Sequence, residues 1–293
     1  MSNLTYSCVA FIDIMGFSNF IKEYDYPSIY QTLKKANEHI KEIIKQQTIL
    51  PNVKVTFFSD NILISTKCPQ AKSTKKWDDC KSSIVGQFMN LINFIQLKSI
   101  LFGYEIFQMP TLPPLRGAIS CGDFIHDNEN DVYFGKPLID TVKMELDSAY
   151  YPRIIYDEEI LSPETIQRQN QLDNINKSYL CKDDSRIAKL IDIKKNTRRL
   201  YFRRDFDGML HGNYLNSIRM DMNDDSTWTK NNLYMIDCHK RYIEKNLNRF
   251  SDYKKYMKII QKYRWMASYH NWYCDGFNEL KQYRIDERVY IIN

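Results

Sequence analysis

Two aspartates in this sequence have the surroundings of metal ligands. The segment VAFIDIMGFS (9–18) is an apolar run that ends in Asp13, and Asp60 stands later between two strand-like runs. Carboxylates that lie close together repel one another unless a cation lies between them. Mg²⁺ is commonly held by one or two carboxylates together with substrate phosphates. The two aspartates are therefore candidate metal ligands, and the alternative is that each is an ordinary turn residue.

The residues that follow Asp13 could bind the phosphates of such a substrate. Met15, Gly16, Phe17 and Ser18 lead from the apolar run into a helical segment. Backbone N–H groups in a turn at the start of a helix suit phosphate oxygens. The sequence therefore predicts a phosphate-binding turn beside the candidate metal ligands.

Nucleophilic catalysis by a side chain is a weaker interpretation. His126 and His211 are isolated in the sequence, and neither has a Ser or Cys partner at a known spacing. A nucleophile needs an adjacent base within hydrogen-bond reach. We therefore expect metal-assisted chemistry rather than a Ser–His or Cys–His site.

The elements that must position these residues follow one another in a β-α-β-β-α-β order. Apolar spacing and β-branched or aromatic runs separate the helices from the strands. This order predicts an α+β fold of the ferredoxin-like split βαβ type, an antiparallel sheet with helices on one face. The expected strands are 6–12, 53–58, 61–66, 115–124 and 153–157, and the expected helices are one opened by Pro27, 84–101 and 135–148.

The chain divides into two parts by composition. Residues 1–215 form the predicted main domain, within which the polar stretch 160–200 is a peripheral elaboration. Residues 216–293 form a predicted helical extension packed on that domain, with two helices inside 231–275. Periodic aromatics such as Trp265 are typical of core packing, and a wider dimer contact is the alternative.

Composition limits the class of protein. The chain has 293 residues, 43% hydrophobic and 26% charged, with a net charge of +5, which is typical of a globular protein. Basic residues are scattered, so a pocket for an anionic small molecule explains the charge and no nucleic-acid partner is predicted. The start has no signal-peptide pattern and no membrane span is predicted, which favours the cytoplasm. Seven cysteines without a CxxC pair indicate reduced thiols.

Four segments together resemble the class III nucleotidyl cyclases. FIDIMGFS resembles their metal-binding segment F-x-D-[IV]-x-G-F-[ST], and FFSDNILIS resembles their second metal-binding hairpin. LRGAISCGDF is similar to their R-x-G-[IV]-x-x-G strand, and YFGKPLIDTVKMELDS to the helix that serves dimerisation and substrate binding. Within the superfamily, the segments RGAIS, GKPLID, DFDG and KYRWMASYHN look like those of the bacterial Pycsar antiviral cyclases. The resemblance spans residues 8–157 and, in this branch, extends to about residue 271.

The resemblance implies a two-metal reaction. Asp13, Asp60 and the Ile14 carbonyl would hold two divalent ions, Mn²⁺ or Mg²⁺. The turn from Met15 to Ser18 would hold the β- and γ-phosphates. Lys143 stands at the position of a catalytic arginine, where it supplies charge without a bidentate fork. Ile139 stands at the position of the transition-state asparagine, and what replaces that asparagine is left open.

Departures from the family pattern point to a pyrimidine substrate. Thr56 stands where adenylate cyclases carry a lysine that reads adenine, and Val132, beside Asp131, stands where they carry an aspartate. Loss of both polar readers argues against ATP and for UTP or CTP, between which the sequence does not decide. Arg116 is a candidate phosphate ligand or a brace within the sheet. Arg203 and Arg204 are alternative phosphate ligands or residues of an exposed strand edge.

The resemblance also implies partners. Class III sites form between two catalytic domains and this chain carries one, so we expect a head-to-tail homodimer that binds a nucleoside triphosphate. The cyclic UMP or cyclic CMP product would activate a separately encoded effector in defence against phage. The alternatives are an adenylate or guanylate cyclase and a catalytically inactive, nucleotide-binding homologue. The trigger, the effector and the role of 160–200 are left open.

Overall fold

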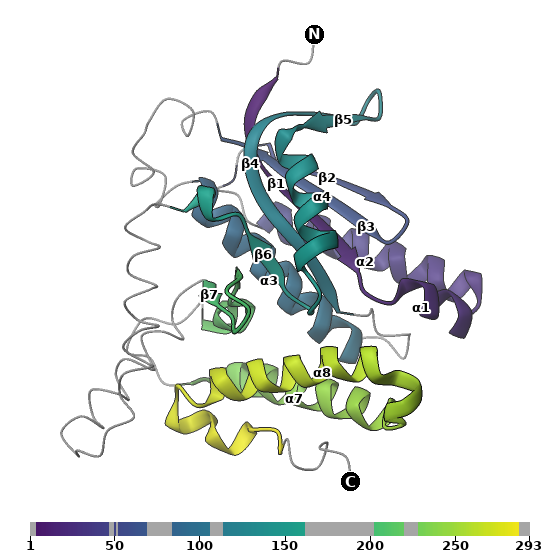
Figure 1. Ribbon diagram of the computed structural model, residues 1–293, viewed down its shortest axis with the longest axis vertical. Coiled ribbons are helices and arrows are strands. Elements are labelled where there is room, and N and C mark those ends of the chain that lie inside the picture. The colour runs from purple at the N-terminus through teal and green to yellow at the C-terminus, as the bar shows by residue number, and fades with distance from the viewer. Residues whose placement is uncertain are drawn as a thin grey trace, which may run out of the picture.

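A sheet with helices on both faces, and a pair of helices beside its lower end, make up the molecule (Figure 1). The structure is a computed structural model. It describes residues 4–46, 50, 52–68, 84–105, 114–161, 202–219 and 228–286.

The strands form one mixed sheet. Its order is β2-β3-β1-β4-β6-β8-β7, and β5 pairs with β4 outside this path. All pairs are antiparallel except β4 with β6. The strands are β1 (Thr5–Ile14), β2 (Lys54–Phe58), β3 (Asn61–Lys67), β4 (Leu115–Asp127), β5 (Val132–Gly135), β6 (Ile154–Tyr156), β7 (Phe202–Arg204) and β8 (Leu210–Gly212).

The helices fall into an N-terminal group that covers the sheet and a C-terminal pair. The first group is α1 (Phe17–Glu23), α2 (Tyr26–Gln46), α3 (Ile84–Glu105) and α4 (Lys136–Ser148). The C-terminal pair is α7 (Lys230–Arg249) and α8 (Tyr253–Cys274). Short 3₁₀ turns are η3 (Glu158–Ile160), η4 (Tyr214–Arg219) and η5 (Asn278–Tyr283).

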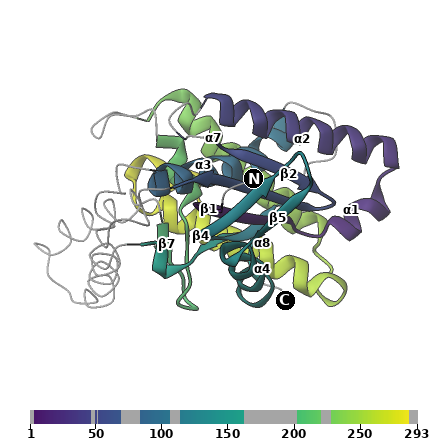
Figure 2. The ribbon, with the colours of Figure 1, turned by 90° about the horizontal axis from the view of Figure 1, so that it is seen from above.

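The predicted split βαβ arrangement is confirmed. Strand β3 lies between β1 and β2, and β1 lies between β3 and β4, as the ferredoxin-like order requires. The prediction of an antiparallel sheet with helices on one face is wrong in one respect. Helices α2 and α3 cover one face, but α4 packs on the other face, against β4 and β1 (Figure 2). The cause is that β5 and α4 form a crossover, which returns the chain as β6 parallel to β4.

Strand β1 sends alternate side chains to the two faces of the sheet. Cys8, Ala10, Ile12 and Ile14 belong to the core beneath α2 and α3, and Val9 belongs to the small core beneath α4. Because side chains alternate along a strand, Asp13 lies on the same face as Val9 and α4. The alternation of side chains along β1 therefore places the candidate metal ligand on the face that α4 covers.

Helix α3 is shared by two hydrophobic cores. Residues from Val85 to Ile95 pack in the core beneath the sheet, and Leu97, Ile100 and Leu101 pack in a second core with η4, α7 and α8. By length and composition the segment Ile84–Leu101 could cross a membrane, but 61% of it is buried inside the protein, as in the central helix of a globular core. The two cores are therefore joined through one continuous helix.

The two C-terminal helices that were predicted within 231–275 are confirmed. Thr229 caps α7, with its side chain accepting from the Asn232 N–H, and Asp252 caps α8 by accepting from the Lys255 N–H. Both are side-chain types that favour helix starts. Trp265 packs in the second core, as predicted. The polar stretch 160–200 lies almost wholly outside the described residues, so its peripheral role stays a prediction.

Candidate active site

The structure brings the two predicted metal-ligating aspartates to the same end of the sheet. Asp13 lies in β1, opposite Asn61 of β3 and Arg116 of β4. The Ile14 N–H donates a hydrogen bond of 2.9 Å to the Asp60 carbonyl oxygen. This bond fixes the β2–β3 turn to the end of β1, so the spacing of the two aspartates is set by backbone rather than by flexible side chains.

Arg116 connects Asp13 to a third carboxylate that the sequence did not indicate. Its Nε lies 2.7 Å from Asp13 Oδ2 and 2.8 Å from Glu145 Oε1. A guanidinium carries one hydrogen on Nε, and it is donated to Asp13. Glu145 Oε1 is left buried without a hydrogen bond. Burial raises the pKa of Glu145, Arg116 opposes that rise, and Asp13 and Asp60 add to it.

The charge around Arg116 is unbalanced. One guanidinium pairs with the carboxylates of Asp13 and Glu145, and the charge of Asp60 acts on Glu145 as well; we call these four residues the Arg116 cluster. Excess negative charge at a half-buried site favours a cation. Among the described residues, no group of three or more His, Cys, Asp and Glu side chains is arranged as a metal site. The oxygens of Asp13 and Asp60 with the Ile14 carbonyl fit a hard cation that takes its remaining ligands from substrate or water.

Gly117 allows Arg116 to reach Asp13. A Cβ at this position would lie 2.2 Å from the Phe11 carbonyl oxygen, so β1 and β4 could not approach as closely with any other residue. The Gly117 N–H donates to the Arg153 carbonyl oxygen at 3.2 Å, at the start of β6. The glycine therefore fixes the strand that carries Arg116 between two neighbours.

The predicted phosphate-binding turn exposes only part of its backbone. Gly16 adopts a left-handed conformation with φ 76°, and its carbonyl oxygen accepts from the N–H groups of Asn19 and Phe20 as α1 begins. The Met15 N–H is already bonded to the Pro114 carbonyl oxygen at 3.0 Å. Met15 and Phe17 are buried, whereas Gly16 and Ser18 are exposed. The groups accessible to a ligand are therefore those around Gly16 and Ser18.

Thr56, the predicted base reader, belongs to a polar network on the same face of the sheet. Its Oγ1 lies 2.9 Å from His126 Nε2, and His126 Nδ1 lies 2.7 Å from Ser65 Oγ. Burial, with the charge of Lys54, lowers the pKa of His126 to about 4, so the ring is neutral at pH 7. A neutral ring has one N–H, so one hydroxyl donates to the imidazole and the other accepts from it.

Val132 lies at the end of the β4–β5 arm that carries His126. It pairs with Asp127 and is exposed. Asp131, its neighbour, has φ 53° and accepts a hydrogen bond of 3.2 Å from Tyr133. Val132 and His126 therefore lie on the same arm, but Val132 is paired with Asp127, whose side chain alternates with that of His126 along β4, so the two side chains leave the arm on opposite faces.

Lys143 and Ile139 are not brought to the Arg116 cluster of their own chain. Both lie on the exposed face of α4 with Leu146, whereas Glu145 lies on the buried face. Residues four apart in a helix share a face, so Ile139 and Lys143 point away from Asp13. Any catalytic contribution of Lys143 would have to be made to a second molecule.

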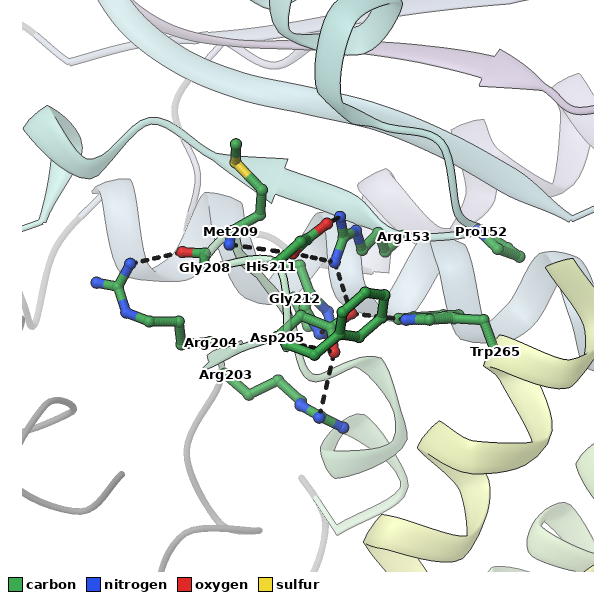
Figure 3. Close-up of polar contacts among 12 residues, drawn as sticks. Pro152, Arg153, Arg203, Arg204, Asp205, Gly208, Met209, His211, Gly212 and Trp265 are labelled. Atoms are coloured by element: carbon green, nitrogen blue, oxygen red, sulfur yellow. Dashed lines mark hydrogen bonds and ion pairs between the residues drawn. The ribbon is translucent and has the colours of Figure 1, made fainter. Parts of the chain in front are cut away.

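Arg203 and Arg204 are occupied by ion pairs away from Asp13. Arg203 pairs with Asp205 at 3.5 Å, and Arg204 donates to Glu158 and to the Gly208 carbonyl oxygen. Figure 3 shows the fully buried Arg153 and Arg203 both directed at Asp205, with Arg204 turned away toward Gly208. Arg153, Arg203, Asp205, Asp207 and Trp265 form a set that we call the Arg153 clasp.

Sequence reasoning missed two residues of the candidate site. Glu145 follows Pro137 and Thr141 at four-residue spacing on the buried side of α4, and a carboxylate on such a stripe is a signal of a buried partner. His126 was set aside as a catalytic group, but its contact with Thr56 joins residues 70 apart. No local pattern in the sequence indicates that contact.

No protein-family model matches the chain, and no curated protein matches it either. Among solved structures, it is similar to the monomeric guanylyl cyclase domain of the RhoGC fusion protein from the aquatic fungus Blastocladiella emersonii, with TM-score 0.40 and 17% identity over 57% of this chain and 87% of that one. It is also similar to a bacterial light-regulated adenylyl cyclase (TM-score 0.37, 14% identity, 57% and 81%). A third is the guanylate cyclase domain of RhGC from Catenaria anguillulae (0.35, 15%, 55% and 84%).

Proposed function

We propose that this protein is a class III nucleotidyl cyclase, a lyase that converts UTP or CTP to its 3′,5′-cyclic monophosphate and diphosphate. The observation that carries the proposal is the pairing of Asp13 and Asp60 at one end of the sheet, locked by the bond from the Ile14 N–H to the Asp60 carbonyl oxygen. The unbalanced charge of the Arg116 cluster supports a cation there.

Two divalent ions, Mn²⁺ or Mg²⁺, are the cofactors of this proposal, held by Asp13, Asp60 and the Ile14 carbonyl. When bound, they would favour deprotonation of the ribose 3′-hydroxyl and offset charge on the leaving diphosphate. In the reaction the 3′-oxygen bonds to the α-phosphorus, the bond from that phosphorus to the bridging oxygen breaks, and the hydroxyl proton is released.

In this proposal the protein's own residues orient the metal-ligating carboxylates and hold the phosphates of the substrate. Arg116 holds the Asp13 carboxylate by its Nε–H, which fixes the direction of the remaining oxygen. Gly16 and Ser18 present the exposed part of the turn to the β- and γ-phosphates. The two Nη atoms of Arg116 carry four further N–H donors, so Arg116 could contact a phosphate while its Nε–H holds Asp13.

A pyrimidine base is the proposed specificity. Thr56 presents a hydroxyl that is held by neutral His126, with Val132 at the end of the same arm. A hydroxyl and a neutral imidazole can each donate or accept, and both suit the small polar edge of uracil or cytosine. Neither supplies the fixed positive charge of the lysine that reads adenine in the cyclases the sequence resembles.

A head-to-tail homodimer is the proposed working form. Large apolar side chains are exposed along β5, α4 and the end of β2, where a second copy would bury them. Such a contact would also deliver Lys143 to the partner's site. These side chains are Phe58, Val132, Phe134, Ile139 and Leu146, with exposed fractions from 43% to 70%.

The proposed role is second-messenger synthesis in defence against phage, in the cytoplasm. The support is the resemblance of the RGAIS, GKPLID, DFDG and KYRWMASYHN segments to Pycsar cyclases. The cyclic nucleotide would act on an effector encoded separately, so the cyclase itself needs no contact with that effector.

Incubation of the pure protein with each of ATP, GTP, UTP and CTP in Mn²⁺, followed by separation of products, tests the proposal. We expect cyclic UMP or cyclic CMP with one diphosphate per turnover. Cyclic AMP or cyclic GMP alone would contradict the pyrimidine specificity and leave the cyclase activity standing. Absence of any cyclic product would contradict the activity, and nucleotide binding without metal dependence would then identify an inactive homologue.

A further inference from the structure

A cavity of about 460 Å³ lies between the turn after Asp13 and the C-terminal helices. Met15 and Gly16 line it from the turn, Lys22 from α1, and Lys255 and Lys262 from α8. This volume is in the range of small-molecule sites, roughly 300–1,000 Å³. Segments more than two hundred residues apart in the sequence therefore enclose a space that begins at the predicted phosphate turn.

The lining of this cavity is positively charged. Four cationic side chains, Lys22, Arg249, Lys255 and Lys262, face one carboxylate, Glu23. That carboxylate is paired with Arg249 across the junction of α1 and α7. The three lysines therefore give the lining a net positive charge, which attracts an anion.

Lys262 joins the cavity to the Arg116 cluster. Burial lowers the pKa of its ammonium group, the charge of Arg116 lowers it further, and Asp13 acts in the opposite direction. Its ammonium lies 5.9 Å from the centre of the Tyr150 ring. Within the described part of the chain it forms no ion pair with a carboxylate. A half-buried ammonium group without such a partner, beside a guanidinium, is costly unless an anion binds.

We propose that Lys262 is a phosphate-binding residue, and that α8 closes the triphosphate end of the active site. This inference rests on the proposed function, in which Asp13 and Asp60 hold the ions at the α-phosphate. The terminal phosphates then extend past Gly16 into the cavity, where Lys262 contacts them and Lys22 and Lys255 add charge. The C-terminal helices are by this assignment part of the substrate site.

The ligand chemistry is that of a linear polyphosphate, so inorganic tripolyphosphate is the probe. Calorimetric titration without divalent ions measures its binding to the full chain and to Lys262→Gln. A hydrogen bond to a charged group is worth enough that we expect binding to weaken by at least about tenfold. Lys254→Gln is the matched control, since Lys254 is exposed on the same helix and does not line the cavity. We expect it to bind as the wild type does.

Steady-state kinetics with the active nucleotide form the second arm. Lys262→Gln is expected to raise KM by at least about tenfold with a smaller change in kcat, because the contact is made to substrate as well as to the transition state. Lys262→Arg, which keeps the charge, is expected to recover most of the loss. If Lys262→Gln does not fold, the comparison is made between Lys262→Arg and Lys262→Met, which keeps the aliphatic stem.

The two arms separate this inference from the proposed function. Cyclic nucleotide formed with an unchanged KM in Lys262→Gln overturns the inference and leaves the cyclase activity intact. Tripolyphosphate binding that depends on Lys262, without cyclisation of any nucleotide, supports the inference and overturns the activity. Equal tripolyphosphate binding by wild type and Lys262→Gln, or none by the wild type, overturns the inference.

Discussion

Two arginines on neighbouring strands have opposite surroundings. Arg153 is fully buried and the clasp balances its charge, with Arg153 and Arg203 facing Asp205 and Asp207. Arg116 is 26% exposed and, within the described part of the chain, is the one guanidinium paired with Asp13 and Glu145, while Asp60 adds a further negative charge nearby. The two arginines lie close in the fold, because the Gly117 N–H of β4, next to Arg116, donates a hydrogen bond to the Arg153 carbonyl oxygen at the start of β6.

The difference indicates which cluster supports the fold and which supports chemistry. Within the Arg153 clasp, Asp205 also accepts the indole N–H of Trp265 at 2.6 Å, and the Arg153 guanidinium lies 5.3 Å from the centre of the Tyr151 ring. The Arg153 Nε is buried without a hydrogen-bond partner, but the charges of the clasp are paired. A buried pair is costly to break because the surviving charge is left without a partner. The Arg116 cluster retains spare negative charge at an accessible surface, which is expected of a site that binds a cation.

The largest expected effect is on catalysis. Asp13→Asn and Asp60→Asn should each reduce cyclic-nucleotide formation by about a thousandfold or more, because the metal contributes several kcal/mol of transition-state stabilisation. Neither change should lower the free energy of unfolding, since each removes surplus negative charge. Product analysis and denaturant titration measure the two quantities. Asp237→Asn, in an exposed ion pair of α7, is the control, and substantial turnover in either site variant would refute the metal assignment.

The clasp should dominate stability. Arg153→Met is expected to lower the free energy of unfolding by about 3–5 kcal/mol, because Asp207 loses its ion pair with Arg153 and the buried Asp205 keeps the longer pair with Arg203. Arg116→Met should cost less, since water reaches Arg116 and Glu145 can take up a proton. Urea titrations of both variants at one pH make the comparison. Equal losses in the free energy of unfolding for Arg153→Met and Arg116→Met would show that the two clusters support the fold to the same extent.

Mn²⁺ should raise the free energy of unfolding by binding at the Arg116 cluster and not at the Arg153 clasp. A ligand that binds only the folded state adds about 2.7 kcal/mol at a hundred times its Kd. We expect this gain in the wild type and in Arg153→Met, and its loss in Asp13→Asn. Thermal unfolding followed with and without the ion measures it. A gain that survives in Asp13→Asn would place the ion elsewhere.

The smallest expected effect is the pH dependence of the clasp. The Nε2 of buried His211 lies 4.0 Å from Asp205 of the clasp, and burial, with the charges of Arg203 and Arg153, holds the pKa of His211 well below its usual value. The unfolded chain therefore binds the extra proton first, below about pH 6.5, and the free energy of unfolding falls as pH decreases from 7 to 5. His211→Asn should reduce this slope by at most about 1.4 kcal/mol per pH unit. An unchanged slope would show that His211 does not report on the clasp.

The order of elements could be predicted from the sequence because each is encoded locally. The hairpin at Ser59 and Asp60, the apolar alternation of β1 and the two C-terminal helices all depend on neighbouring residues. The placement of α4 on the second face could not be predicted in this way. It depends on β6 pairing parallel with β4, a contact between distant segments.

The candidate site could likewise be predicted where it depends on local sequence, and not where it depends on contacts between distant segments. Asp13 and Asp60 stand at strand ends that the sequence marks clearly, and both lie at one end of the sheet, where the Ile14 N–H bonds to the Asp60 carbonyl oxygen. Arg116 was recognised, but its sharing between Asp13 and Glu145 requires the register of β1 with β4 and the packing of α4. Lys262 comes from the far end of the chain, and only the folded structure brings it to the same site.

The double role of α3 has a consequence for the chain during its synthesis. Ribosomes deliver the N-terminal part first, but Leu97, Ile100 and Leu101 have no apolar cover until η4, α7 and α8 emerge. These apolar residues of α3 are therefore exposed on the nascent chain until the later elements pack on them, and they form a surface that chaperones can bind. The α8 wall of the cavity beside Gly16 is likewise synthesised after the sheet, so this cavity is complete only once α8 has been made and has packed.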